Sequence, residues 1–200
     1  MKYFDVLMLN RQRLLWTIAT RKQLERWEPI VAAGVQSGSA RGELEPADIW
    51  SAEIERHFVL VAARNLLRAL DLEPPSSVAI NPVVRAELKE GRDLVEHWPD
   101  NLPVFNVHPR REEPLRRSGK DFAERNPRHG PYNWLSWSNV TGARVLPNVS
   151  APALRELLDA VQAEVLASDP ELARFVPPRA PSPWHHENGE WWPKQPQLDA

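Results

Sequence analysis

The segment "PADIWSAEIERHFVLVAARNLLRALDL", residues 46–72, decides the fold of this chain. Good helix formers fill it, and neither proline nor glycine interrupts it after Pro46. Its middle, "FVLVAA", is apolar nearly all the way round, which is typical of a helix buried on more than one side. Such a helix is about 37 Å long. Its length and apolar character call for several partner helices or a second copy of the chain.

Two more helices are predicted on either side of this segment. Residues 3–27 form a helix, which we expect Pro29 to break or restart ahead of a loop rich in glycine and serine. Residues 83–98 form another, with Pro82 in the first turn and Pro99 as the stop. Its apolar residues fall on a single stripe: Val84, Leu88, Gly91, Val95 and Trp98.

A last helix begins at Ser150, which is a good N-cap, and Pro152 fits its first turn. Its apolar stripe consists of Leu154, Leu157, Leu158, Val161 and Val165. Helices joined in this way predict a mainly α fold, an antiparallel helical bundle. A bundle of this kind would form a single domain over residues 1–175.

Prolines set two segments apart from the bundle. Residues 99–149 hold seven prolines and no convincing helix, so we expect a long insertion, with a short β-hairpin that turns at Thr141–Gly142. Residues 176–200 form a tail rich in proline and tryptophan, which we expect to be an extended arm rather than part of the core. Such an arm could wrap its own subunit, bind a protein partner or stay disordered.

Composition narrows the classes of function. The net charge of −2 gives no overall attraction to nucleic acid or to an anionic membrane. The chain has no cysteine, which excludes disulfides, thiolate metal sites and a cysteine nucleophile. The N-terminus does not read as a signal peptide, and no apolar run approaches the ~20 residues of a membrane span. We therefore expect a cytoplasmic protein that does not enter a membrane.

The stretch "EGRDLVEHWPDN", residues 90–101, is the candidate for chemistry. On a helical wheel, Asp93 and His97 fall opposite the apolar stripe and Arg92 falls on its flank. Asp93 and His97 are also four residues apart, so a carboxylate–imidazole hydrogen bond is within reach. A histidine can transfer protons in RNA cleavage while an arginine holds the phosphate. The plainer interpretation is a solvated helix end, where charged residues are common.

The pattern "EGRDLVEHW", residues 90–98, resembles the signature helix of the HEPN superfamily, and "AEIERHFVLVAARNLLRAL" resembles the apolar helix that pairs with it. The resemblance covers residues 47–98 and implies a helical bundle, often dimeric, in which two such motifs meet in a cleft. Active members are metal-independent ribonucleases, many of them toxins or antiviral effectors, and other members only bind or act as scaffolds. Asp93 stands where the family most often has asparagine.

Glu53 and His57 form a second pair, four residues apart on the long helix. They are candidates to support Arg92, Asp93 and His97 in the catalytic cleft. Alternatively, the four acid and histidine side chains of the two pairs bind a metal between helices, although the spacing is one longer than in di-iron bundles. The structural alternative is a buried or half-buried salt bridge of Glu53 with Arg56 or Arg92.

The insertion and the tail supply candidate binding residues. Seven basic and four acidic residues lie between positions 108 and 128, followed by Tyr132, Trp134 and Trp137. Basic side chains next to aromatic ones can hold single-stranded RNA, and the predicted RNA contacts are Arg110, Arg111, Arg116, Arg117 and Lys120. The alternative is that these charges are solvated and the tryptophans cover the end of the bundle.

Two functions follow from these patterns. The first is a HEPN-like homodimer that cleaves RNA without metal or cofactor, in which His97 is the general acid/base and Arg92 holds the phosphate. The second is a non-catalytic helical interaction protein whose tail and insertion bind a partner. Adjacent histidines in the tail, His185 and His186, do not by themselves indicate a metal site.

Overall fold

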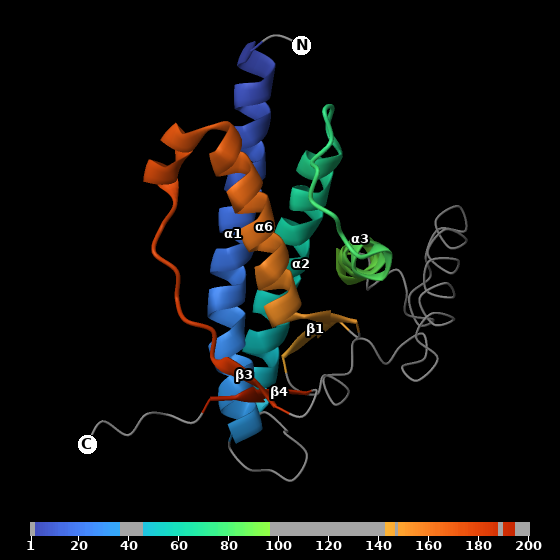
Figure 1. The fold of residues 1–200 in the computed structure, drawn as a ribbon. Helices are drawn as coiled ribbons and strands as arrows, with labels where there is room; N and C mark the ends of the chain where they lie inside the picture. The colour runs from blue at the N-terminus through green and yellow to red at the C-terminus, as the bar shows by residue number, and fades with distance from the viewer. Residues whose placement is uncertain (1–2, 37–45, 97–142, 147, 188–189, 195–200) are drawn as a thin grey trace, which may run out of the picture.

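The computed structural model describes residues 3–36, 46–96, 143–146, 148–187 and 190–194 (Figure 1). This part of the chain is mainly helical, as predicted. Three helices lie side by side: α1 (Tyr3–Gln36), α2 (Pro46–Asp71) and α6 (Ala151–Ser168). Both α2 and α6 run opposite to α1, and the fourth helix, α3 (Pro82–Glu96), crosses their direction and is seen nearly end-on.

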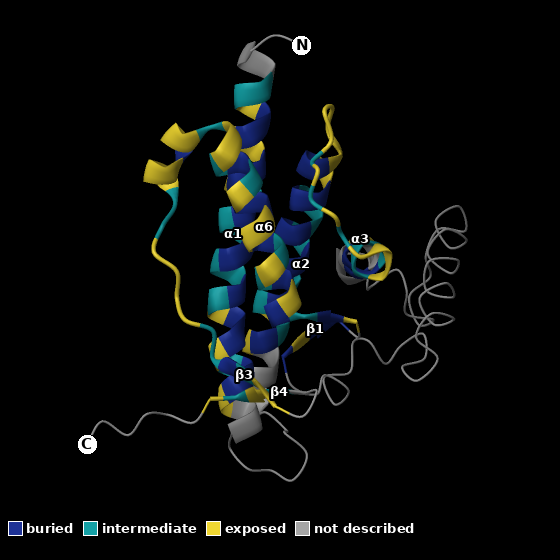
Figure 2. Ribbon diagram, viewed as in Figure 1, coloured by how far each residue is buried: buried dark blue, intermediate teal, exposed yellow. Residues whose placement is uncertain are grey.

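Two small hairpins and a 3₁₀ helix complete the described structure. Strand β1 (Arg144–Leu146) pairs antiparallel with β2 (Val149–Ser150), and β3 (Trp184–Glu187) pairs antiparallel with β4 (Glu190–Pro193). The 3₁₀ helix η3 (Pro170–Phe175) follows α6. It leads into an extended segment that is mostly exposed (Figure 2) and returns along the outside of the bundle to β3.

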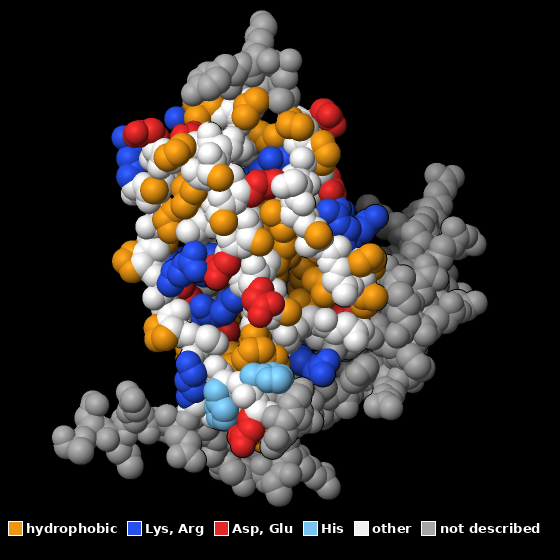
Figure 3. Space-filling view, viewed as in Figure 1, with side chains coloured by type: hydrophobic (Ala, Val, Ile, Leu, Met, Phe, Trp, Pro, Cys, Tyr) orange, Lys and Arg blue, Asp and Glu red, His pale blue; other side chains and the backbone are white. Residues whose placement is uncertain are grey.

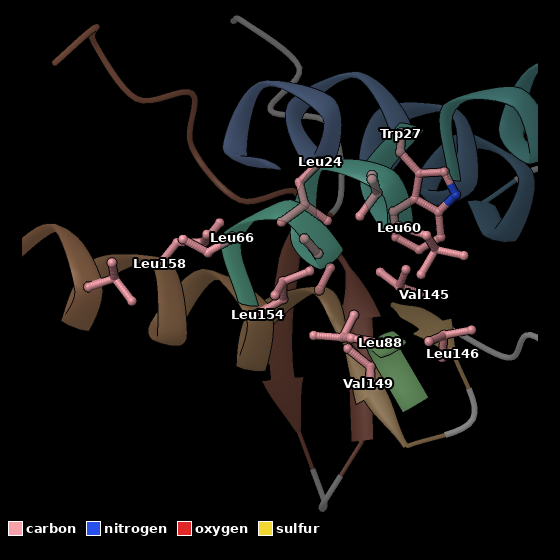
Figure 4. Close-up of a cluster of buried hydrophobic side chains, with 14 of the residues drawn as sticks. Leu24, Trp27, Leu60, Leu66, Leu88, Val145, Leu146, Val149, Leu154 and Leu158 are labelled. Atoms are coloured by element: carbon pink, nitrogen blue, oxygen red, sulfur yellow. The ribbon is translucent and has the colours of Figure 1, made fainter. Parts of the chain in front are cut away.

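The core draws on every helix and on the first hairpin. Figure 4 shows one cluster made by side chains of α1, α2, α3, α6 and the β1–β2 hairpin. Its labelled members include Leu24, Trp27, Leu60, Leu66, Leu88, Val145, Leu146, Val149, Leu154 and Leu158. The apolar stripes of α3 and α6 therefore point inward where their side chains are described.

The predicted boundaries of α2 and α6 are confirmed. The N-cap at Ser150 is present, because its Oγ accepts a hydrogen bond from the backbone nitrogen of Ala153 at 3.2 Å. At the C-terminal end of α2, the buried Arg13 of α1 donates to the backbone oxygens of Ala69 at 3.2 Å and Pro74 at 2.5 Å. Arg13 thus hydrogen-bonds to carbonyl groups at and just beyond the C-terminal end of α2, where the last helical carbonyls have no partner within the helix.

The expected break at Pro29 is wrong. α1 continues through Pro29 to Gln36. A proline inside a helix removes one hydrogen bond and costs about 3 kcal/mol. The residues around it explain why the helix persists, since Trp27, Glu28 and Val31 are all buried while Pro29 faces solvent. Packing of these neighbours outweighs the local cost.

A short hairpin lies just after the position predicted for one. Its strands are β1 and β2, so residues 147–148 join them. Thr141 and Gly142, where the turn was expected, lie outside the described residues, as do the other residues from 97 to 140 and residue 147.

The expectation that the tail stays outside the core is also wrong. Trp184, at the start of β3, is only 2 % exposed and belongs to the core cluster. The arm therefore wraps its own subunit over residues 176–187 and 190–194, which was one of the three alternatives. A large aromatic side chain gains too much by burial to remain in solvent when a site on the bundle can take it. None of the described helices has the length and apolarity needed to span a membrane.

Candidate functional site

The backbone of α3 is fixed just ahead of the predicted motif. Gly91 faces β1 so closely that a Cβ atom on it would lie 2.9 Å from Cδ1 of Leu146. One turn earlier, the buried Glu87 carboxylate accepts hydrogen bonds from the backbone nitrogen of Asn148 at 2.9 Å and from its Nδ2 at 2.5 Å. Leu88 between them is fully buried. These contacts hold α3 against the β1–β2 hairpin.

The motif itself begins at the next residue. Arg92 and Asp93 belong to the last turns of α3, but their side chains lie outside the described part of the structure, and so does all of His97. The predicted RNA contacts Arg110, Arg111, Arg116, Arg117 and Lys120 lie outside it as well, as do Tyr132, Trp134 and Trp137. Their roles stay predictions.

Glu53 forms the predicted salt bridge with Arg56. Arg56 is buried, and its Nη2 donates to Oε2 of the half-buried Glu53 carboxylate. The other oxygen, Oε1, is also buried and has no hydrogen-bond partner among the described residues. Burial raises the pKa of Glu53 above its ordinary value, and the positive charge of Arg56 opposes part of that rise. The carboxyl group therefore holds a proton more readily than an exposed glutamate does.

His57 lies on the outer side of α2. It is half-buried, and its ring meets the edge of Phe58 at a centroid distance of 5.6 Å. Phe58 and Ile54 are large apolar side chains that stay 48 % and 55 % exposed. Among the described residues, neither Glu53 nor His57 hydrogen-bonds to α3. Because the side chains of Arg92, Asp93 and His97 lie outside the described residues, the predicted role of Glu53 and His57 beside them stays a prediction.

The described residues contain no group of three or more acid or histidine side chains that could hold a metal ion. This does not test the metal hypothesis for the four residues on α2 and α3, because the side chains of Asp93 and His97 are not described. In the described part of the tail, His185 pairs with Glu187 at 3.6 Å and His186 contacts the ring of Trp191.

The most extensive polar cluster of the described chain was not predicted. It lies between α1 and α6, where Arg21 donates to Gln162 at 2.5 Å and to Asp159 at 2.7 Å. Further along, Arg155 donates to both oxygens of the fully buried Glu28. We call this set the α1–α6 seam, and it consists of Asn10, Arg21, Glu28, Arg155, Asp159, Gln162 and Ser168.

Burial dominates the electrostatics of the seam. It raises the pKa of Glu28, against the effect of the Arg155 guanidinium, and it lowers the pKa of Arg21. The sequence carried one signal of the seam, because Asn10, Arg21 and Glu28 recur at helical spacing. Charged residues at such a spacing usually mark a solvated face, so the signal alone did not indicate burial.

The seam also holds the start of the arm. The backbone nitrogen of Ala180 donates to Glu25 at 3.0 Å, and its oxygen accepts from Arg155 at 3.2 Å. Arg179 pairs with Asp159 at 2.8 Å. Figure 3 shows basic and acidic side chains next to one another on this face of the molecule. The seam is therefore a structural feature that joins α1, α6 and the arm.

No family model, no curated protein and no solved structure matches the chain.

Proposed function

We propose that this chain is a HEPN-like helical protein that cleaves RNA without a metal ion, with Arg92 and His97 as the reacting pair. The observation that supports the proposal is the position of the first residues of the motif, Arg92 and Asp93, on α3. The motif starts directly after Gly91, where the helix packs against Leu146, and α3 in turn packs against the long apolar helix α2. A reactive pair needs such a rigid support, because catalysis depends on the orientation of its groups.

The chemistry follows from the two side chains. The His97 imidazole removes the proton of a ribose 2′-hydroxyl, and the 2′-oxygen attacks the adjacent phosphorus. The bond from phosphorus to the 5′-oxygen breaks, and an imidazolium returns a proton to that oxygen, so the products are a 2′,3′-cyclic phosphate and a 5′-hydroxyl. Arg92 binds the phosphate and stabilises the charge that develops on it. Asp93 orients the imidazole.

The other predicted residues take supporting roles in this proposal. Glu53 and His57 are polar neighbours of the reacting pair, and the basic residues from Arg110 to Lys120 hold the RNA strand by its phosphates. A homodimer brings two copies of the motif to one cleft. The proposed biological class is a toxin or defence ribonuclease.

The test is RNA cleavage in the presence of EDTA by the wild-type chain and by Arg92→Ala and His97→Ala. Loss of a proton-transferring side chain should slow cleavage by about 100-fold or more. His186→Ala is the matched control, because His186 is exposed on the tail hairpin and should leave the rate unchanged. Cleavage that survives His97→Ala contradicts the assignment, and cleavage that EDTA abolishes favours the metal alternative.

A second candidate function is a non-catalytic interaction protein. The exposure of Ile54 and Phe58, one turn apart on α2, favours it, because two large apolar side chains on one helix face can pair with another chain. Under this alternative no RNA is cleaved. The double substitution Ile54→Ser with Phe58→Ser should then change the mass of the particle in solution, which light scattering measures, while the helical circular dichroism is retained.

A further inference from the structure

Residues 176–183, "VPPRAPSP", have a conformation that their sequence dictates. Prolines at 177, 178, 181 and 183 lock their own φ and force each preceding residue into extended conformations. Val176 has φ −80° and ψ 115°, and the segment runs extended along the bundle (Figure 1). Because the prolines have no N–H, this segment offers few donors for strand pairing. Such a segment favours the polyproline II helix, which has about three residues per turn.

With three residues per turn, every third side chain of the segment points in the same direction, and we call each such row a ridge. Pro178 and Pro181 lie on one ridge, and both are exposed. Pro177 and Pro183 lie on another ridge and are half-buried. Ala180, on that second ridge, has both its backbone groups bound to the bundle, through Glu25 and Arg155. The bundle therefore holds one side of the segment. Pro178 and Pro181 stay exposed, although the backbone oxygen of Pro178 accepts a hydrogen bond from Lys22 at 3.5 Å.

Arg179 provides a cation on the third ridge. Its side chain is 44 % exposed and pairs with Asp159, which is itself 50 % exposed. An ion pair this open to water contributes little to stability. Asp159 also accepts a hydrogen bond from Arg21, so it keeps a partner when Arg179 turns away. Arg179 is thus available to an acidic group on another molecule.

We infer that the exposed Pro178–Pro181 ridge, together with Arg179, is a docking segment for a protein domain whose groove is lined by aromatic side chains and bordered by an acidic one. Two prolines spaced as P-x-x-P are what such grooves bind, and the exposed cation Arg179 between them can pair with the acidic side chain at the border of the groove. Since the bundle already holds the segment extended, binding loses less conformational entropy than binding of a free peptide. This inference does not depend on RNA cleavage.

The experiment uses the full chain and a panel of purified SH3 and WW domains with acidic residues beside the groove, and it measures binding by isothermal titration calorimetry. We expect at least one domain to bind the wild type. The double variant Pro178→Ala with Pro181→Ala should bind that domain about tenfold more weakly or worse. Arg179→Ala should weaken binding by a smaller factor.

Pro177→Ala is the matched control, because Pro177 is a half-buried proline of the neighbouring ridge. Its affinity for the domain should lie within about twofold of the wild-type affinity, whereas loss of a hot-spot contact should lower the affinity by about tenfold. Thermal unfolding of each variant checks that the arm stays in place. The inference is overturned if no domain in the panel binds the wild type, if the double variant binds as tightly, or if Pro177→Ala weakens binding equally.

Discussion

Helix α1 packs against two other helices, α2 and α6, by different means. Toward α2 it contributes apolar side chains such as Leu24 and Trp27, which lie in one cluster with Leu60 and Leu66 (Figure 4). Toward α6 it contributes Asn10, Arg21 and Glu28, each hydrogen-bonded to a specific partner. The apolar interface supplies stabilisation through the area removed from water.

The α1–α6 seam has a different consequence. Asn10 meets Ser168 near one end of α1, Arg21 meets Gln162, and Glu28 meets Arg155 toward the other end. Apolar surfaces can slide past one another at small cost, whereas a buried polar group that loses its partner is expensive. The comparison therefore indicates that the seam fixes the register of α6 on α1, and that the apolar interface provides most of the stability.

Arg155→Met should have the largest effect. It removes the partner of the fully buried Glu28 and leaves that carboxyl group unpaired, which costs about 3–5 kcal/mol of unfolding free energy. Urea denaturation at neutral pH measures the loss. Arg179→Met is the control, because its pair with the half-exposed Asp159 is worth at most about 1 kcal/mol.

The double replacement Glu28→Leu with Arg155→Met sharpens this test. Replacing both partners of a buried ion pair by apolar side chains is often neutral or stabilising. We expect the double variant to recover most of the loss caused by Arg155→Met alone. A double variant that is as unstable as the single one would show that the stranded charge is not the cause.

Leu60→Ala tests the apolar interface and should cost about 2–5 kcal/mol, because Leu60 is fully buried and a cavity would replace its side chain. Unlike the loss in Arg155→Met, this loss should be the same in acidic and neutral buffer, since no titratable group changes its surroundings. Urea denaturation at two pH values compares them. A strongly pH-dependent loss in Leu60→Ala would remove the distinction between the two interfaces.

Gly91→Ala tests the support of the motif on α3. The added Cβ would meet the Leu146 side chain at 2.9 Å, so that buried side chain, the helix or the hairpin must shift, at a cost of about 1–3 kcal/mol. Thermal unfolding measures it. In the double variant Gly91→Ala with Leu146→Ala, the shorter side chain at position 146 should remove the clash. Gly91→Ala should therefore destabilise the Leu146→Ala variant less than it destabilises the wild type. Equal effects in both backgrounds would contradict the close packing of α3 on β1.

The smallest effect is a pH dependence that comes from Glu28. Burial raises its pKa in the folded chain above the ordinary value of 4.5, so the unfolded chain loses this proton first as the pH rises. The stability that the protonated group contributes is complete below the ordinary value and is lost as the pH passes the folded pKa. Relative to Glu28→Gln, the wild type should therefore lose stability from acidic toward neutral pH. Urea denaturation over a pH series checks the direction, and a difference that grows the other way refutes it.

The sequence was sufficient for the elements with strong local signals. The run from Pro46 to Asp71 has no breaker, and Ser150 with Pro152 marks the start of α6, so both helices could be predicted. The continuation of α1 through Pro29 and the burial of Trp184 could not, because they depend on packing between residues distant in sequence. Local patterns contain no information about such contacts.

The same division applies to the candidate site. The salt bridge of Glu53 with Arg56 is a contact within one helix, and the sequence offered it as one alternative, with Arg92 as the other partner. The seam joins residues that are more than a hundred positions apart, such as Glu28 and Arg155, and single charges on two helices do not indicate that they pair. The convergence of Arg92 and His97 on a cleft is a long-range arrangement of this second kind, and it stays a prediction.

The central proposal is metal-free RNA cleavage through the ribose 2′-hydroxyl. The most direct measurement is the chemical nature of the new ends when the wild-type chain acts on an RNA oligonucleotide in EDTA, with a matched oligonucleotide that carries a single 2′-deoxy sugar at the cleaved position. The proposal predicts a 2′,3′-cyclic phosphate and a 5′-hydroxyl from the RNA, and no cleavage at the deoxy position. Cleavage of both oligonucleotides at that position, or no cleavage of the RNA, would contradict it.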